Sequence, residues 1–557
     1  MTNQKTNITK NQRKFIFIAV IFFTTLFSAT PSFAFDQNAA GETTHSYGDT
    51  LKTAKLTLDG FNKSGEQAAL ATSRIKELQA NPNFGGIWFD DNQLIIGATD
   101  PKDKQLNTIA KELGAKVKQT KYKDSDVQKI FKAIKDNIPN YSAVTYRYDN
   151  PNTMTIRLAI PAGVAADLAA IGDLPPNVEI KVVPMEDIAQ LTTGMNDNIS
   201  SELVESGNIY YTMQPNNLEL TCSFAFPAIA PDGANVRISA GHCKEDGKNP
   251  AVKKNNSDTE INIGDYDKVV FNPDSKIHAD ASAIKLKDQT IPNPPTISTH
   301  DKDNTDIELT GLTNPIVGAP VCKSGSYTGV TCGKIIDIRS QNMKDGIYID
   351  GFGTNLDSYP GDSGGGAFIG TKAVGIQSGS TVDKNTSKLL STNFTSITTA
   401  LEALPGYHLQ TVNEPSQPVI APIRDTWVKL GGKAVTGNTL SKQHKDKDAT
   451  IQDFQNGTIV SSKSGTFYIP NNVKKQLEKE GGLSGKYGVP TNYATTEHDV
   501  TKQQFQKGEI KILNDDNNYW KTLIQENLVI IISGILLTVF IAFIAKYMVK
   551  RKSYSSI

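Results

Sequence analysis

A short stretch of small residues, Gly361-Asp362-Ser363-Gly364-Gly365, most constrains what this chain of 557 residues folds into. A serine hydroxyl attacks a carbonyl only when a neighbouring base takes its proton and backbone N–H groups stabilise the resulting oxyanion. Because Gly361 has no side chain, its N–H and that of Ser363 can converge on one point, and Gly364 and Gly365 leave the hydroxyl open to approach. The stretch therefore predicts a nucleophilic Ser363 with an oxyanion hole formed by Gly361 and Ser363.

The spacing of this motif alone leaves two folds open, because α/β-hydrolases place their nucleophile in the same Gly-x-Ser-x-Gly pattern. The order of the other candidates decides between them. His242 follows the apolar stretch Ile238–Gly241, and Asp280 opens the alternating run Ala281–Leu286. His, Asp, Ser is the order of the double-barrel serine proteases, whereas α/β-hydrolases have Ser, Asp, His. We therefore expect His242 to be the general base and Asp280 to orient it.

These residues resemble the chymotrypsin-fold serine proteases, and within them the secreted bacterial branch of streptogrisins and α-lytic protease. The hairpin Val321–Gly333, the approach Thr354–Gly365 and the run Ala373–Ser380 are similar to that branch as well. The resemblance covers residues 200–405 and implies an all-β protease domain of two six-stranded barrels. Short apolar runs separated by Gly, Pro, Asn and Asp in residues 208–399 are also typical of an all-β fold. The implied activity is that of a serine endopeptidase working through an acyl-enzyme.

The chain has four cysteines, and none form a Cys-x-x-Cys pair, which favours extracellular disulfides over a metal site. Three pairings are open by counting, and the resemblance favours Cys222–Cys243 and Cys322–Cys332. No cofactor and no metal are expected.

The resemblance also implies how a polypeptide substrate binds. Ser378, Gly379 and Ser380 would offer main-chain groups to an extended substrate strand. Asp357 lies six residues before Ser363, where trypsin-like enzymes place the carboxylate that receives Arg or Lys, but the streptogrisin pattern has a disulfide cysteine there. Since a buried, unpaired carboxylate is costly, Asp357 either faces water or receives a cation. We expect a preference for apolar or mixed residues rather than basic ones.

A buried ion pair is expected beside the nucleophile. In the chymotrypsin branch the aspartate before the serine pairs with a new N-terminus after cleavage, whereas streptogrisins supply an arginine just after the first hairpin cysteine. Lys323 stands at that position here. We therefore predict a Lys323–Asp362 ion pair, which lysine makes without the bidentate contact of arginine.

The N-terminal part predicts export followed by a pro-region. Residues 1–34 combine basic residues, an apolar run and a small-x-small cleavage site, as in a secretory signal peptide. Residues 35–195 are mixed α/β, with helical periodicity in 65–78, 104–113 and 125–137 and strand-like runs in 86–89, 93–97 and 153–159. They resemble the pro-region that templates folding of α-lytic protease. An unrelated globular domain is the alternative. We expect self-cleavage within the polar segment 194–207.

The C-terminal part predicts surface attachment. A closing helix is expected at 394–404 and a linker at 411–422, followed by two repeats of about fifty residues in 423–512. The repeats resemble LGFP modules, which occur on secreted and surface proteins and are supposed to bind envelope glycan; a spacer role is the alternative. Residues 528–545 lack charge and precede basic residues, which predicts one transmembrane helix, a cytoplasmic tail at 546–557 and an outward-facing, membrane-anchored protease that is either retained or shed.

Charge is balanced at 58 basic and 58 acidic residues, so nothing recommends nucleic acid as a partner. Two rival functions remain. One is a surface adhesin or envelope-binding protein with an inactive protease scaffold. The other is an esterase of α/β-hydrolase type, whose base would be His408, His444 or His498.

Overall fold

The computed structural model describes residues 46–513 apart from short internal stretches: 149–151, 162–167, 185–186, 192–193, 196–203, 214–218, 245–249, 254–259, 291–292, 302–305, 345, 384, 387, 416 and 498–499. The predicted signal peptide, transmembrane helix and tail lie outside the described residues. Within the described part of the chain, no helix is long and apolar enough to cross a membrane.

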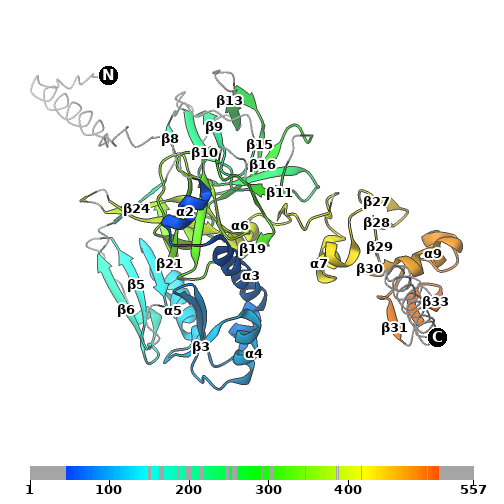
Figure 1. Ribbon diagram of the computed structural model, residues 1–557, viewed down its shortest axis with the longest axis horizontal. Coiled ribbons are helices and arrows are strands. Elements are labelled where there is room, and N and C mark those ends of the chain that lie inside the picture. Colours follow the sequence, from blue (N-terminus) through cyan, green and yellow to red (C-terminus); the bar gives the residue numbers. More distant parts are fainter. Residues whose placement is uncertain are drawn as a thin grey trace, which may run out of the picture. The chain divides into compact units, whose positions relative to one another are not determined.

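The described chain begins with an α/β region whose first half is a three-stranded sheet covered by helices (Figure 1). Its elements are α2 (Tyr47–Thr53), α3 (Leu58–Ala80), β1 (Phe84–Asp90), β2 (Gln93–Ala98), α4 (Lys104–Leu113) and β3 (Lys116–Gln119). Helix α4 has the bounds predicted from its periodicity. Asp103 caps it by accepting from the N–H of Leu106, and Gly114 ends it in the left-handed conformation.

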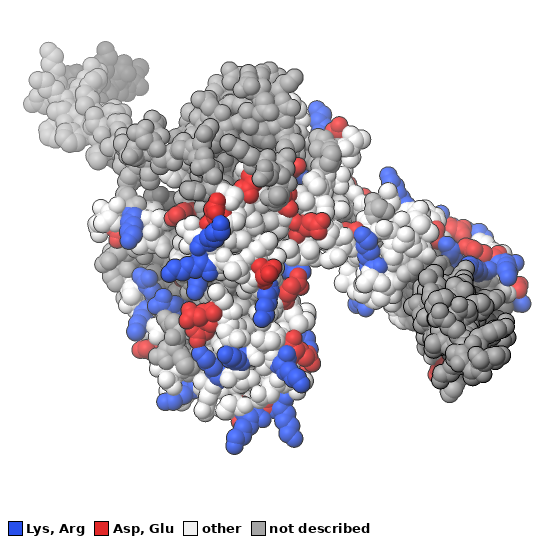
Figure 2. Space-filling view, viewed as in Figure 1, with Lys and Arg blue, Asp and Glu red and all other residues white. Residues whose placement is uncertain are grey.

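The second half of the α/β region is a helix on a strand hairpin. It comprises α5 (Asp124–Asn137), β4 (Ala143–Arg147), β5 (Met154–Ile160), η2 (Leu168–Ile171), β6 (Val178–Pro184), β7 (Asp187–Leu191) and β8 (Gly194–Met195). The helices and strands predicted in this region are confirmed. On the face visible in Figure 2, Lys and Arg are interspersed with Asp and Glu, in line with the balanced composition.

The protease domain follows as two β-rich halves. The first contains β9 (Ile209–Met213), β10 (Glu219–Ser223), β11 (Phe226–Ile229), β12 (Asn235–Ser239), β13 (Ala251–Lys253), β14 (Glu260–Asn262), β15 (Gly264–Val270) and β16 (Ala281–Leu286). These strands form two five-stranded sheets, one completed by β8 and the other by β26 (His408–Leu409). The described pairings in this half therefore differ from the single six-stranded barrel that was expected, because β10 pairs with β8 and β9 whereas β11 pairs with β12 and β26. The short pair β17 (Thr296–Ile297) and β18 (Ile307–Glu308) leads to the second half.

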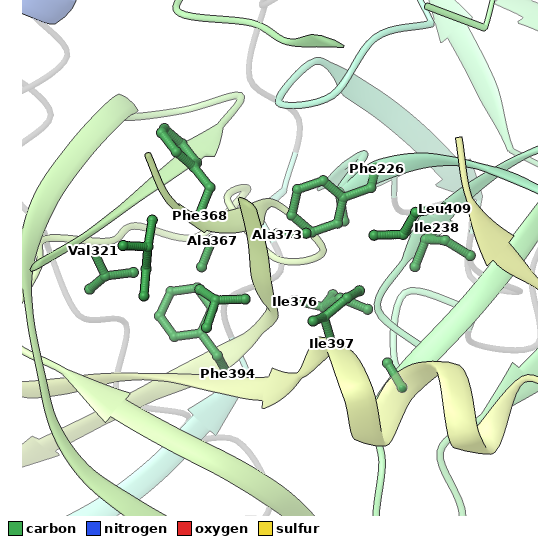
Figure 3. Packing of buried hydrophobic residues seen from close by; sticks show 14 of the residues in the cluster. Phe226, Ile238, Val321, Ala367, Phe368, Ala373, Ile376, Phe394, Ile397 and Leu409 are labelled. Atoms are coloured by element: carbon green, nitrogen blue, oxygen red, sulfur yellow. The ribbon is translucent and has the colours of Figure 1, made fainter. Parts of the chain in front are cut away.

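The second half closes into a six-stranded barrel, as expected. After β19 (Gly311–Leu312) come β20 (Pro320–Gly325), β21 (Gly329–Lys344), β22 (Ile347–Thr354), β23 (Gly366–Ile369), β24 (Lys372–Asp383) and β25 (Leu389–Ser396). The order β20-β23-β24-β25-β22-β21 is closed by pairing of β20 with β21. Apolar side chains from both halves, with Ile397 of helix α6 (Ile397–Ala403), fill one core (Figure 3). The closing helix was predicted from 394; it begins later, because Phe394 lies in β25 and Ser396 caps the helix by accepting from the N–H of Thr399.

The α/β region is part of the same sheet as this barrel. Strand β4 pairs antiparallel with β21, so that β5 and β6 extend the barrel wall outward (Figure 1). Helix α3 packs against β23 of the barrel, where a Cβ added to Gly65 would lie 2.2 Å from the carbonyl oxygen of Ile369. The Phe61 and Phe368 rings meet edge to face there, with centroids 6.0 Å apart. Helix α3 contains Gly65, although glycine weakens helices, because a larger residue would collide with the backbone of Ile369.

Both C-terminal repeats form the same hairpin at corresponding positions. The first copy has α7 (Arg424–Lys429), α8 (Lys433–Thr436), β27 (His444–Asp446), β28 (Ala449–Phe454), β29 (Gly457–Ser462) and β30 (Gly465–Pro470); the second has α9 (Asn471–Lys479), η3 (Gly482–Ser484), β31 (Thr495–Glu497), β32 (Val500–Phe505) and β33 (Gly508–Leu513). Thr439 forms a backbone bridge with Phe454 just as Pro490 does with Phe505. The first copy therefore forms the same backbone bridge with Thr439 at the position where the second copy has Pro490.

The predicted linker 411–422 is not wholly a linker. Val419 and Ile423 are fully buried in the core of the first repeat beside Trp427. Moreover, the buried Gln452 donates to the carbonyl of Pro418, as the corresponding Gln503 donates to that of Tyr468. The first repeat thus begins before residue 423.

Candidate active site

His242, Asp280 and Ser363 meet between the two halves of the protease domain. The Nε2 atom of His242 lies 2.9 Å from the Oγ of Ser363, and its Nδ1 lies 2.6 Å from Oδ2 of Asp280. All three side chains are buried. The distances are those of a hydroxyl, a base and an orienting carboxylate in hydrogen-bonding contact. The three residues predicted from chain order are therefore brought together.

His242 is placed by a close approach of three strands. Gly241 lies between the end of β12 and His242. A Cβ added to Gly241 would lie 2.5 Å from the carbonyl oxygen of Val270 and 3.0 Å from that of Ala281. Only glycine fits between these carbonyls without displacing backbone. The N–H of His242 also donates to Oδ1 of Asp280 at 2.9 Å, which fixes the histidine backbone to the same carboxylate that its ring contacts.

Asp280 receives further support from a residue that the sequence reasoning missed. The N–H of Asp280 donates to Oγ1 of Thr395 at 3.0 Å, and that hydroxyl lies 3.2 Å from the Oγ of Ser378. This chain of contacts ties the carboxylate to β24 and β25. The sequence prediction placed Thr395 in a helix, and the strand-favouring residues Thr392, Phe394 and Thr395 were the signal that could have placed it in a strand.

The turn that carries Ser363 depends on two glycines with positive φ. Gly361 has φ of 108° and Gly364 has φ of 82°. A Cβ at Gly364 would also lie 2.1 Å from Oγ of Ser239 and 2.4 Å from the carbonyl oxygen of Ser223. The hydroxyl of Ser223 donates to the carbonyl of Gly361 at 2.8 Å. The oxyanion turn is therefore anchored to the end of β10.

The predicted Lys323–Asp362 ion pair is confirmed. Nζ of Lys323 lies 3.0 Å from Oδ2 of Asp362, and both side chains are fully buried. Asp362 also accepts from the N–H groups of Tyr327, Thr328 and Tyr359 at 2.9–3.0 Å and from the hydroxyl of Thr328 at 2.8 Å. Burial alone would raise the pKa of Asp362, but the Lys323 ammonium and these donors lower it below the ordinary value. Burial lowers the pKa of Lys323, and Asp362 opposes that shift.

Both expected disulfides, Cys222–Cys243 and Cys322–Cys332, are present. The first joins the end of β10 to the residue after His242. The two sulfurs and a His242 nitrogen lie within 4.8 Å of one another. Because the sulfurs are bonded to each other, they are not thiolate ligands for a metal.

The predicted substrate-binding edge is already paired with the chain's own strand. Strand β7 runs antiparallel to β24, with Leu191 opposite Gly379 and Gln190 opposite Ser380. This is β-strand addition to the edge that was expected to receive a polypeptide. Ser363, at 0% exposure, is covered in this form of the protein.

Asp357 faces water rather than the interior. Its carbonyl accepts from the hydroxyl of Thr331 at 2.7 Å. The segment around it is held by side-chain hydrogen bonds from Gln377 to Ser358 and from Thr392 to the carbonyl of Leu356. These bonds lie where the resembled family has a disulfide. Of the two environments expected for Asp357, the structure has the solvent-facing one.

The two alternative bases that the structure describes do not lie at the nucleophile. His408 lies in β26, His444 is exposed in β27, and His498 is outside the described residues. Two cavities of about 370 and 660 Å³ lie over β4, β5 and β21 and are not lined by the triad.

Comparison with known proteins agrees with this geometry. Residues 233–403 match the family model described as Trypsin. The chain is 31% identical to Glutamyl endopeptidase 2 of Streptomyces griseus over 160 residues, which cover 28% of this chain and 78% of that protein. It is 26% identical to Serine protease 1 of Rarobacter faecitabidus over 60% of this chain and 58% of that protein. It is also 26% identical to Streptogrisin-C of Streptomyces griseus, over 56% of this chain and 62% of that protein. The chain thus spans about 60% of the length of the latter two relatives. With its fold, its His–Asp–Ser constellation and these similarities, the chain belongs to the trypsin family of serine proteases and is related to the streptogrisins.

Proposed function

We propose that the protein is a serine endopeptidase of the streptogrisin type. The observation that carries the proposal is the continuous contact from Ser363 through His242 to Asp280, at 2.9 and 2.6 Å. Ser363 attacks a peptide carbonyl while His242 accepts its proton and passes it to the leaving amine. Asp280 stabilises the imidazolium that forms. The N–H groups of Gly361 and Ser363 bind the oxyanion, and water then hydrolyses the acyl-enzyme.

The test is active-site labelling combined with peptide hydrolysis. The mature wild-type protein should react with a fluorophosphonate at Ser363 and hydrolyse an unstructured polypeptide. Ser363→Ala should do neither. Asp280→Asn keeps the Ser363 hydroxyl that the fluorophosphonate labels, but it should lose most of the rate of peptide hydrolysis, because His242 would be held in the wrong tautomer. Failure of the folded, mature wild type to label and to hydrolyse would instead support the inactive-scaffold alternative.

The α/β region 35–195 acts, in this proposal, as a pro-region that templates folding of the protease domain. Support comes from the β4–β21 pairing and from α3 against β23, since both bury surfaces of the second barrel. Barrels of this kind are dominated by non-local strand pairing, which slows folding. A preformed strand edge supplied by β4 would guide that pairing. Refolding the protease domain with and without residues 35–195 added in trans tests this role.

The proposed setting is the outer face of a cell membrane. It rests on the sequence patterns of residues 1–34 and 528–545, which predict export and a single membrane span. The repeats would hold the enzyme near envelope glycan or act as a spacer. Binding of residues 415–513 to purified cell walls, compared with the same segment after heat denaturation, separates these two roles.

A further inference from the structure

Two strands of the chain's own, β7 and β8, pair with the protease domain on either side of the nucleophile. Strand β7 pairs with β24, and its last residue, Leu191, lies opposite Gly379. Strand β8 pairs with β10, and its first residue, Gly194, lies opposite Thr221. A polypeptide that runs in this direction therefore meets β24 first and β10 second.

The turn that carries Ser363 is bonded to both of these protease strands. The N–H of Gly364 donates to the carbonyl of Gln377 in β24 at 2.9 Å. The N–H of Ser223, at the end of β10, donates to the carbonyl of Ser363 at 2.7 Å. When a peptide bond is cut, the part before the bond becomes the acyl-enzyme and the part after it leaves as the amine. In a substrate that follows this path, the acyl part lies along β24 and the leaving part lies along β10.

A pair of stacked tyrosines stands beside the turn that forms the oxyanion hole. The rings of Tyr327 and Tyr359 are 4.6 Å apart between centroids and 10° from parallel, and both residues are half-buried. Their backbone N–H groups donate to the two carboxylate oxygens of Asp362, at 3.0 Å from Tyr327 and 2.9 Å from Tyr359. Both rings are therefore held next to the residue that precedes the nucleophile.

Gly361 shows that this tyrosine pair lies on the leaving side of the cut. A Cβ added to Gly361 would lie 3.4 Å from the Cβ of Tyr327 and 3.5 Å from Oγ1 of Thr221 in β10. The side chains of Thr221 and Tyr327 thus approach the same point. Residues that pair across two strands have their side chains on the same face of the sheet. The side chain of a substrate residue opposite Thr221 therefore faces the tyrosine pair.

The chain's own strand has a glycine, Gly194, at this position, so it brings no side chain to the tyrosine pair. A substrate can bring one. Aromatic rings favour further rings at their faces and edges, in offset-stacked or edge-to-face contact. We propose that Tyr327 and Tyr359 form the binding surface for an aromatic side chain that follows the cut. The inference rests on the proposed function and adds to it a class of substrate.

The aromatic residue lies within three residues after the cut. Leu191, opposite Gly379, and Gly194, opposite Thr221, are separated by three peptide bonds. In a substrate bound in the same register, the bond that Ser363 attacks is one of these three. The residue opposite Thr221 is then the first, second or third residue of the leaving part.

The first test measures kcat/KM of the mature wild type on internally quenched peptides. Their acyl part copies a site that the wild type cuts in an unstructured polypeptide, and each of the three residues after the bond is in turn Phe, Leu, Glu, Lys or Gly. At one position the wild type should prefer Phe to Leu about 2- to 10-fold, the gain typical of an aromatic contact beyond its buried area. Absence of this preference at all three positions, or a stronger preference for another of these residues, would overturn the proposal.

The second test repeats the Phe-to-Leu comparison in Tyr327→Leu and Tyr359→Leu, which keep an apolar side chain but remove a ring. Either substitution should reduce the preference, whereas Tyr327→Phe and Tyr359→Phe should retain it. Tyr407→Leu is the control and should leave the preference unchanged, since the Tyr407 hydroxyl donates to Asp267 elsewhere in the protease domain.

The ratio between two peptides distinguishes binding of the leaving part from support of the turn. Rings that only supported the oxyanion turn through Asp362 would affect all peptides equally, because the acyl part and the triad are the same in each. An equal loss of rate on every peptide, with the preference for Phe intact, would therefore refute the proposal. A wild type that cuts peptides without this preference would refute the inference alone. A wild type that neither labels with a fluorophosphonate nor cuts any peptide would remove the proposed function as well.

Discussion

Breaking the Lys323–Asp362 pair should cost unequal amounts from its two ends. Lys323→Met keeps the length of the side chain but removes the ammonium from a site with 0% exposure. Asp362 would then remain buried with four donors, namely three backbone N–H groups and the Thr328 hydroxyl. Asp362→Asn would instead leave Lys323 buried, with the Thr328 hydroxyl and the Gly329 carbonyl as remaining contacts.

Removing one partner of a buried ion pair costs about 3–5 kcal/mol. We expect Lys323→Met near the lower end, about 3 kcal/mol, because the remaining donors still neutralise part of the buried carboxylate. We expect Asp362→Asn near the upper end, about 5 kcal/mol, because an isolated ammonium is left and the amide serves fewer donors. Activity should fall more steeply than stability in Asp362→Asn, since Asp362 adjoins Ser363 and fixes the turn that forms the oxyanion hole.

The measurement should be local and made in a Ser363→Ala background, which prevents self-digestion. Trp88 lies in β1 and Trp427 in α7, both outside the protease domain, so the fluorescence of these tryptophans would not report on the pair. Amide hydrogen exchange in the segments 320–333 and 355–366, measured as a function of urea concentration, does report on the pair. Lys334→Met, an exposed lysine on the same hairpin, is the control and should change exchange by less than about 0.5 kcal/mol. Lys323→Met behaving like this control, or Asp362→Asn costing less than Lys323→Met, would refute the reasoning.

Three further predictions concern specificity, pH and topology. Asp357→Asn should change kcat/KM little on matched peptides with Leu, Phe, Arg, Lys or Glu before the cut, because Asp357 faces water; a selective loss on Arg and Lys would contradict this. Burial, with Arg424 nearby, lowers the pKa of His408 from 6.5 to about 3, so its contribution to stability is complete above pH 6.5 and is lost as the pH falls towards 3. His408→Gln should therefore flatten the dependence of unfolding free energy on pH between 6.5 and 3, and an unchanged slope would exclude this role. Protease added to intact cells should remove everything before Leu528, whereas a protected catalytic domain would show that the orientation is wrong.

The sequence predicted the parts of this molecule whose signal is local or chemically specific. Helix α4 was placed correctly because apolar residues at helical spacing lie between Asp103 and Gly114, which mark its ends. His242, Asp280 and Ser363 were found because the glycine-rich turn marks the nucleophile, and the order His, Asp, Ser along the chain then distinguishes this class of protease from the α/β-hydrolases. Lys323 was matched with Asp362 because it stands just after the first hairpin cysteine, where the resembled streptogrisins have an arginine.

What the sequence did not predict depends on which distant edges meet. Strand β7 is five residues long and combines Ile188, Ala189 and Leu191 with two polar residues, a composition that suits many partner strands and does not point to β24. Thr395 was assigned to the wrong element because a short helix follows directly. The start of the first repeat was missed because Val419 is buried only by contacts made after folding.

The fold also determines how the activity would be restrained. The triad is already in hydrogen-bonding contact while β7 covers β24, so the catalytic groups need no rearrangement. In the chymotrypsin branch a new N-terminus must reach the aspartate beside the nucleophile. Here Lys323 already occupies that role before any cleavage. The self-cleavage predicted within 194–207 would therefore have one task, to release the strand that fills the substrate edge, and activity should appear as the released segment leaves. The lag between cleavage and activity then measures dissociation of the α/β region, and weakening the β4–β21 pairing should shorten it.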